Sequence, residues 1–157
     1  MTILRMMMCV LAFWAAQVIA QDTPPVAAFF LGSGKLCEHG LDKGSPLPDG
    51  TEIEVFWDWD ENGPDAKDPQ PIVGEEVGQA NFNVFKINSA DLGAEAGQFL
   101  SDPMFVIVGE LPKPSTYYLR VCLESKQLVS NVVKLSSGLA DYEFAEWTIE
   151  TTPCKKK

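Results

Sequence analysis

The sequence is poor in the residue types on which most enzyme active sites and nucleic-acid interfaces depend. It has a single histidine, His39, and 12 basic residues against 22 acidic ones, which gives a formal net charge of −10. Such a surface does not attract nucleic-acid phosphates or an anionic membrane. His39 lies two residues from Cys37 in a glycine-rich segment, whereas catalytic Cys/His pairs usually meet across a fold. The sequence therefore predicts a protein that is not an enzyme and does not bind nucleic acid.

Long hydrophobic runs are also lacking. The longest apolar stretch, residues 6–16, is shorter than the roughly 20 residues that a spanning helix needs. Arg5 precedes this stretch, and Val18-Ile19-Ala20 comes before a polar segment that contains prolines. This pattern predicts a cleaved secretory signal at residues 1–20, followed by one domain over residues 21–157 without a membrane span. We therefore expect a secreted, extracellular protein. A periplasmic or cell-surface location is equally compatible with a signal peptide.

Helical periodicity is almost absent, and short alternating or β-branched runs separated by turn residues predict an all-β domain. The clearest strand is 51–59, in which one face carries Thr51, Ile53, Val55, Trp57 and Trp59. Gly93 and Gly97 limit the one segment with helical character, 89–98, to a turn. The other expected strands are residues 26–31, 72–73, 80–87, 99–100, 104–108, 117–123, 128–135 and 142–149.

The segment after the clearest strand, residues 58–68, is rich in oxygen ligands. The candidate ligands for a cation are the side chains of Asp58, Asp60, Asn62, Asp65 and Asp68 and the carbonyl of Pro64. Asp58, Asp60 and Asn62, followed by Gly63, match the first half of an EF-hand calcium loop, in which alternate residues direct oxygens at one ion. Pro69 stands where an EF-hand has its bidentate glutamate, so the segment is more similar to the Asp-x-Asp-x-Asn-Gly loops of extracellular calcium-binding proteins.

We expect calcium in this acidic loop, although the same residue types also form solvated turns. Several carboxylates within 11 residues repel one another in the absence of a cation, which favours the metal site over the turn. Zinc is disfavoured because the loop contains neither histidine nor cysteine.

Three cysteines remain after the predicted signal: Cys37, Cys122 and Cys154. Export permits disulfides, and an odd number leaves one thiol free or paired between chains. Both Cys122–Cys154 and Cys37–Cys122 are possible pairs at this point.

The stretch from Leu111 to Leu135 resembles the last two strands of fibronectin type III and related immunoglobulin-like domains. It reads Leu-Pro-Lys-Pro-Ser-Thr-Tyr-Tyr-Leu-Arg-Val-Cys and continues to a Ser-Asn-Val-Val run. The resemblance implies a single antiparallel β-sandwich. It also implies that Tyr117 is the corner tyrosine, that Leu119, Val121 and Leu123 face the core, and that Arg120 and Cys122 face outward. An outward Cys122 favours Cys122–Cys154, which would fix the additional C-terminal strand.

These observations predict a secreted, non-catalytic module with a structural or adhesive role at the cell surface or in the extracellular matrix. Its partner would be an extracellular protein or a polysaccharide. Self-association through strand edges or the odd cysteine is also possible, and the basic tail, residues 155–157, is expected to be disordered. The alternative is a carbohydrate-binding module that uses the exposed aromatics Trp59 and Trp147, while Trp57 is expected to pack in the core.

Overall fold

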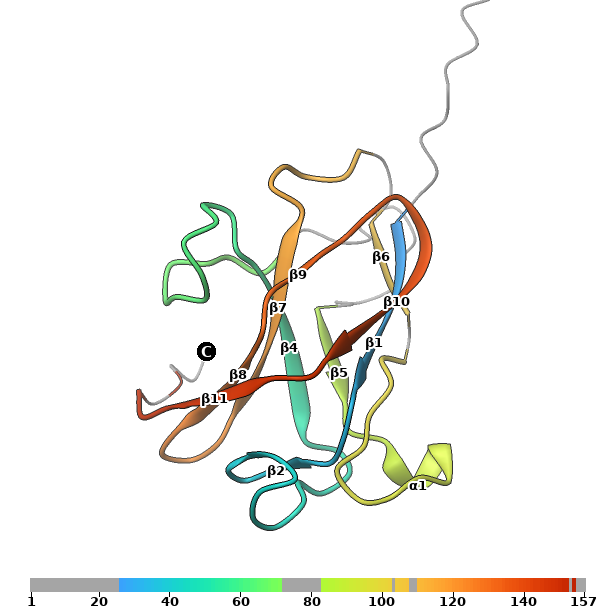
Figure 1. Cartoon of the computed structure of the whole chain (residues 1–157), viewed down its shortest axis with the longest axis vertical. Helices are drawn as coiled ribbons and strands as arrows, with labels where there is room; N and C mark the ends of the chain where they lie inside the picture. The colour runs from blue at the N-terminus through green and yellow to red at the C-terminus, as the bar shows by residue number, and fades with distance from the viewer. Residues whose placement is uncertain (1–25, 72–82, 103, 108–109, 153, 155–157) are drawn as a thin grey trace, which may run out of the picture.

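A computed structural model of the chain describes residues 26–71, 83–102, 104–107, 110–152 and 154. This part consists mainly of strands, with one helical turn (Figure 1). The elements are β1 (Val26–Gly32), β2 (Leu36–Cys37), β3 (Gly40–Leu41), β4 (Glu52–Trp57), β5 (Val84–Lys86), α1 (Ser89–Leu92), β6 (Phe105–Ile107), β7 (Thr116–Cys122), β8 (Gln127–Ser130), β9 (Val133–Lys134), β10 (Gly138–Phe144) and β11 (Trp147–Glu150). The all-β class predicted from the sequence is confirmed.

The strands form two main sheets and a small hairpin. The first sheet has the order β10-β1-β6, the second has the order β11-β8-β7-β4-β5 with β9 also beside β7, and β2 pairs with β3. β1 and β10 run parallel, with Val26 opposite Gly138 and Gly32 opposite Phe144 (Figure 1). The expectation of a purely antiparallel arrangement is wrong at this pair, because β10 enters the first sheet at the end where β1 begins.

The two sheets share one hydrophobic core. Alternate residues of each strand point into it, as the period of two along a strand requires. The core residues of the first sheet are Val26, Ala28, Phe30, Phe105, Ile107 and Phe144, and those of the second are Ile53, Val55, Phe85, Tyr117, Leu119, Val121 and Leu128. Each large apolar side chain buried in this way contributes about 1.5–3 kcal/mol. On the other side of β4 and β7, Phe56 and Tyr118 are also buried and pack with Val129 in a second, smaller cluster.

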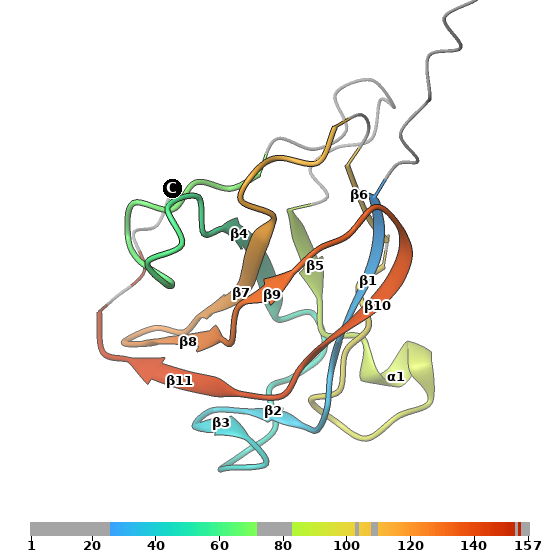
Figure 2. The same ribbon diagram turned by 45° about the horizontal axis from the view of Figure 1, so that its top comes forward.

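The predicted run 142–149 is two strands that belong to different sheets. β10 pairs with β1, and after Ala145 and Glu146 the chain continues as β11, which pairs with β8 (Figure 2). Asn131 stabilises this corner, because its N–H donates to the Glu146 carbonyl at 2.9 Å and its side-chain oxygen accepts the Glu146 N–H at 3.1 Å. The C-terminal segment therefore links the two sheets.

The side chains of β7 alternate between the core and the outer face, as expected. Leu119 and Val121 are fully buried, whereas Arg120 is half-buried and Cys122 is exposed. Tyr117 is also fully buried, but its hydroxyl has no hydrogen-bond partner among the described residues. The corner tyrosine of immunoglobulin-like domains normally bonds to the backbone through this group, so the structure departs from the resemblance here.

The segment 89–98 contains one helical turn, α1, which agrees with the limit set by its glycines. Gly93 ends the turn in the left-handed conformation, with φ 62°. Gly97 has φ 87°, and its carbonyl accepts a hydrogen bond from the Leu36 N–H at 2.9 Å. A Cβ on Gly97 would lie 2.6 Å from the Leu36 carbonyl oxygen. A side chain at Gly97 would therefore separate this turn from β2.

Several expectations lie wholly or partly outside the described residues. These are the signal peptide at 1–20, the first residues of the predicted domain (21–25), the run 72–73, the first part of the run 80–87, the last residue of the run 104–108 and the basic tail at 155–157. Within the described ranges, no helix has the length and hydrophobicity required to cross a membrane.

Candidate functional site

The acidic loop begins where β4 leaves the second sheet. Because side chains alternate along a strand, Asp58 lies on the same face as Glu54 and Phe56, opposite to the core. The loop closes on itself: the Trp57 N–H donates to the Pro69 carbonyl at 3.0 Å. The Tyr118 hydroxyl donates to the Asp65 carbonyl at 3.3 Å and so holds the loop against the outer face of the sheet. The two ends of the loop are thereby brought together.

Loop closure brings three carboxylates together. One oxygen of each of Asp58, Asp60 and Asp68 lies within 4.8 Å of the others. Asp58 is only 3% exposed and Asp68 only 7%, and Oδ1 of each is buried without a hydrogen-bond partner among the described residues. Asp60 is exposed. Buried carboxylate oxygens normally have partners, so this group has the chemistry of a cation site.

The remaining predicted ligands make further contacts within the loop. The Asn62 side-chain amide donates to Asp60 Oδ2 at 2.8 Å, which forms a tight turn around Glu61 and Gly63, both with positive φ. Asp65 Oδ1 accepts the Lys67 N–H at 2.6 Å, and Asp65 is not part of the carboxylate group. The structure thus brings together Asp58, Asp60 and Asp68, while Asn62 and Asp65 shape the loop. Pro64 follows this turn and lines a neighbouring cavity.

The electrostatics of the group favour a bound cation. Burial, with smaller contributions from the negative charges of Asp65 and Asp58, raises the pKa of Asp68, although the Asp65 N–H and the Tyr118 hydroxyl oppose this shift by hydrogen bonding. Burial and the nearby Asp68 carboxylate raise the pKa of Tyr118 as well. In the described part of the chain, the salt bridges join Lys35 to Glu95 and Arg120 to Glu54, so none neutralises the three carboxylates.

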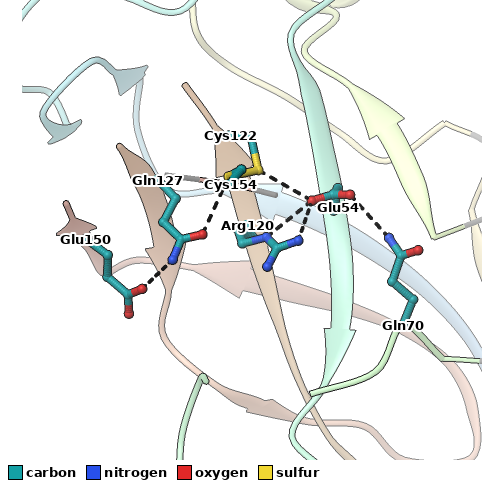
Figure 3. Close-up of a disulfide and its surroundings, with 7 residues drawn as sticks. All are labelled: Glu54, Gln70, Arg120, Cys122, Gln127, Glu150 and Cys154. Atoms are coloured by element: carbon teal, nitrogen blue, oxygen red, sulfur yellow. Dashed lines mark hydrogen bonds and ion pairs between the residues drawn. A yellow bond between two sulfur atoms is a disulfide. The ribbon is translucent and has the colours of Figure 1, made fainter. Parts of the chain in front are cut away.

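A row of polar contacts crosses the outer face of the second sheet (Figure 3). Arg120 on β7 donates to Glu54 Oε2 on β4 through Nη2 at 2.9 Å and through Nε at 3.2 Å. Gln127 on β8 donates to Glu150 on β11. Between these pairs, Cys122 forms a disulfide with Cys154, with their Cα atoms 5.7 Å apart. This is the pair that the resemblance favoured, and it fixes the segment at Cys154 to the end of β7.

Among the described residues, the cysteine that forms no disulfide is Cys37, and it is part of the interior. Cys37 is 2% exposed, and its thiol donates to the Lys35 carbonyl at 3.4 Å. This position disfavours a disulfide-linked dimer through Cys37. The exposed His39 contacts Lys126, with its Nδ1 3.0 Å from the lysine Nζ. The two residues that could have formed a Cys/His pair therefore have separate surroundings.

The tryptophans differ in accessibility. Trp57 packs against the core and its indole N–H donates to the Pro114 carbonyl at 2.7 Å, as expected of a core residue. Trp59, between two of the clustered aspartates, is 47% exposed. Trp147 also packs against the core, its ring is 6.2 Å from that of Phe99, and its indole nitrogen is buried. Of the two aromatics proposed for carbohydrate binding, Trp59 is therefore accessible to a ligand, whereas most of Trp147 packs against the core.

Sequence reasoning did not identify the outer-face residues that surround the loop. Phe56 and Tyr118 stack with their ring centroids 5.5 Å apart, and the Arg120 guanidinium carbon lies 3.8 Å from the Phe56 ring centroid. Alternation along β4 and β7 puts these three residues on the face opposite to the core. Two aromatic residues on that face could have indicated a second cluster or a binding surface there.

Comparisons with protein-family models, curated proteins and solved structures gave no match to this chain. Its function must therefore be inferred from the site itself.

Proposed function

We propose that the chain is a secreted, non-catalytic β-sandwich module with a structural or adhesive role at the cell surface or in the extracellular matrix, and that its acidic loop binds calcium. One observation carries the metal assignment: Asp58, Asp60 and Asp68 converge within 4.8 Å, and two of them are buried with unpartnered oxygens. An uncompensated buried charge is costly, and a cation removes this cost.

Calcium fits the chemistry of the group best. It prefers six to eight oxygen ligands, and carboxylates from a flexible loop can provide them together with backbone carbonyls and water. Zinc would need histidine or cysteine, and the loop has neither. Extracellular calcium modules bind with dissociation constants of about 0.1–1 mM. We expect the same range here, with the ion holding the loop rigid.

The immunoglobulin or fibronectin type III character of the sandwich is supported by the arrangement around β7. This strand lies between β4 and β8 in the second sheet, with Leu119 and Val121 inward and Arg120 outward. The C-terminal segment then adds β10 and β11 to the two sheets. Domains of this class serve largely as binding or spacing modules, which favours an extracellular protein as partner.

Thermal unfolding with and without calcium tests the metal assignment. The melting temperature would be measured in EDTA, in 5 mM CaCl₂ and in 5 mM MgCl₂ for the unmodified protein, Asp60→Asn and Asp141→Asn. Asp60 and Asp141 are both exposed, but Asp141 lies on β10 in the other sheet and serves as the matched control. Calcium should raise the melting temperature of the unmodified protein and the control, and Asp60→Asn should reduce this rise. An equal rise in all three proteins would contradict the proposal.

A carbohydrate-binding role is the second candidate, because Trp59 is nearly half exposed beside the loop. Flat aromatic rings suit the faces of sugars, but one exposed tryptophan gives a small platform. Affinity electrophoresis in gels containing polysaccharides would test this role. Retardation that disappears in Trp59→Ala would support it, and the absence of retardation would exclude the polysaccharides used.

A further inference from the structure

A cavity of about 320 Å³ lies on the outer face of the second sheet, beside the acidic loop. Its floor includes Phe56, Tyr118 and Val129, which form a second hydrophobic cluster away from the core. One wall is formed by loop residues between Pro64 and Asp68, and another by Glu150, Thr152 and Cys154. Figure 3 shows the strands that carry the polar residues of this face.

The cavity is held in shape by interactions that need no ligand. The stacked rings of Phe56 and Tyr118 fix the floor, and Tyr118 also binds the loop through its hydroxyl. The disulfide between Cys122 and Cys154 holds the C-terminal wall against β7. A cavity that is formed in advance binds with a smaller entropic cost, because little has to be ordered on association.

The charges lining the cavity are unbalanced. The basic residue in its lining, Arg120, is already paired with Glu54 and packed on Phe56. Asp65 in the acidic loop and Glu150 on β11 both line the cavity. Each accepts a hydrogen bond at one carboxylate oxygen, Asp65 from the Lys67 N–H and Glu150 from Gln127. No hydrogen bond reaches the second oxygen of either residue from the described parts of the chain. The cavity thus combines an aromatic floor with two available carboxylates.

We propose that this cavity binds the side chain of a lysine from an extracellular protein partner. The unbranched apolar stem of lysine suits the aromatic floor, and its ammonium group is complementary to Asp65 and Glu150. The volume is at the small end of the range for ligand sites, about 300–1,000 Å³, which fits one side chain better than a large ligand. Asp68 also lines the cavity, but neither Asp65 nor Glu150 belongs to the group of three carboxylates proposed to bind calcium, so this proposal does not require a bound metal.

Nuclear magnetic resonance titration of the purified protein with Nα-acetyl-lysine methylamide tests the proposal. All samples would contain EDTA, so that the result is independent of calcium. We expect saturable shifts of the Tyr118, Val129 and Glu150 amides with a dissociation constant of roughly 1–10 mM, typical of a single small group. Nα-acetyl-norleucine methylamide, which has the same stem without the charge, should bind at least about tenfold more weakly, since a charged hydrogen bond is lost.

Charge-neutralising variants locate the site. Glu150→Gln should weaken binding of the lysine probe about tenfold or more, while Glu143→Gln, an exposed glutamate on β10, should leave it unchanged. Equal binding of the two probes, shifts away from the cavity, or equal effects of the two variants would overturn the proposal. If the lysine probe binds only after Lys155, Lys156 and Lys157 are replaced by glutamine, the occupant is the chain's own tail, which also overturns it.

Discussion

Replacing Asp68 by asparagine should stabilise the protein in the absence of calcium. Asparagine has nearly the same shape, and its oxygen can keep the hydrogen bond that Asp68 Oδ2 accepts from the Asp65 N–H at 2.9 Å. The change removes a negative charge that lies within 4.8 Å of oxygens of Asp58 and Asp60. Coulomb's law gives a repulsion of about 3.5 kcal/mol per pair at this distance with an effective dielectric constant of about 20. Because Asp60 is exposed and screened, we expect a net gain of about 1–3 kcal/mol.

Calcium should reverse the benefit. With a dissociation constant of about 0.1–1 mM, 5 mM calcium stabilises the unmodified protein by about 1–2.3 kcal/mol, or roughly 3–9 °C in melting temperature. Asp68→Asn lacks a ligand and should gain less. Urea unfolding at pH 7, followed by tryptophan fluorescence in EDTA and in calcium, measures both effects, with Asp141→Asn as the control. If Asp68→Asn is less stable than the unmodified protein in EDTA, the carboxylate is favourably paired and the electrostatic argument for a metal fails.

The pH dependence in EDTA provides a second check. The pKa of Asp68 is raised by burial, so the native state binds this proton more tightly than the unfolded state does. Lowering the pH from neutral through the raised pKa should therefore relieve the cost of the buried charge in the unmodified protein. The advantage of Asp68→Asn should shrink over the same interval. An advantage that stays constant from pH 7 to about pH 4 would show that this carboxyl does not titrate as proposed.

Three further perturbations have defined outcomes. Tyr117→Phe should stabilise the protein by about 1 kcal/mol, because the hydroxyl is buried without a partner among the described residues. A lower free energy of unfolding in urea would show instead that the hydroxyl makes the backbone hydrogen bond typical of immunoglobulin-like domains. Burial raises the pKa of Tyr117 to about 12, so the native state keeps a proton that the unfolded state loses, and stability should fall from about pH 10 upward, less steeply in Tyr117→Phe. Replacing Cys122 and Cys154 together by serine should cost about 3.7 kcal/mol for a separation of 32 residues; no change in chemical unfolding would mean that the bond constrains nothing. Trp59→Ala should change stability by less than about 0.5 kcal/mol, as expected for an exposed side chain, and a larger loss would show that Trp59 packs in the native loop.

The sequence predicts where the strands lie along the chain better than which strands pair with one another. Alternation along 51–59 and 117–123 places Ile53 and Leu119 in the core and Arg120 outside it, because a period of two depends only on local geometry. The parallel pairing of β1 with β10 joins residues more than 100 positions apart, and no local pattern specifies it. The division of 142–149 at Glu146 is likewise not predictable from the sequence, since it depends on hydrogen bonds to Asn131, which directly follows β8.

The candidate site shows the same division between local and long-range information. Spacing alone identified Asp58 and Asp60, since residues two apart on a turn direct their oxygens to one side. Asp68 was one candidate among several, because its approach to Asp58 depends on closure of the loop through the Trp57 N–H and the Pro69 carbonyl. The cavity beside the loop requires the C-terminal segment to lie over β7, and the sequence predicted only the cysteine pair that holds it there.

The disulfide between Cys122 and Cys154 has a mechanical consequence. It encloses β8, β9, β10 and β11 in one covalent loop with a sequence separation of 32 residues. A force pulling the chain from Val26 and from its C-terminal end passes through the bond directly to β7, so the enclosed strands bear none of the extension. At about 3.3–3.6 Å per residue, roughly 110 Å of chain is kept from lengthening. A module under tension would therefore have a fixed maximum length while oxidised and a longer one once reduced.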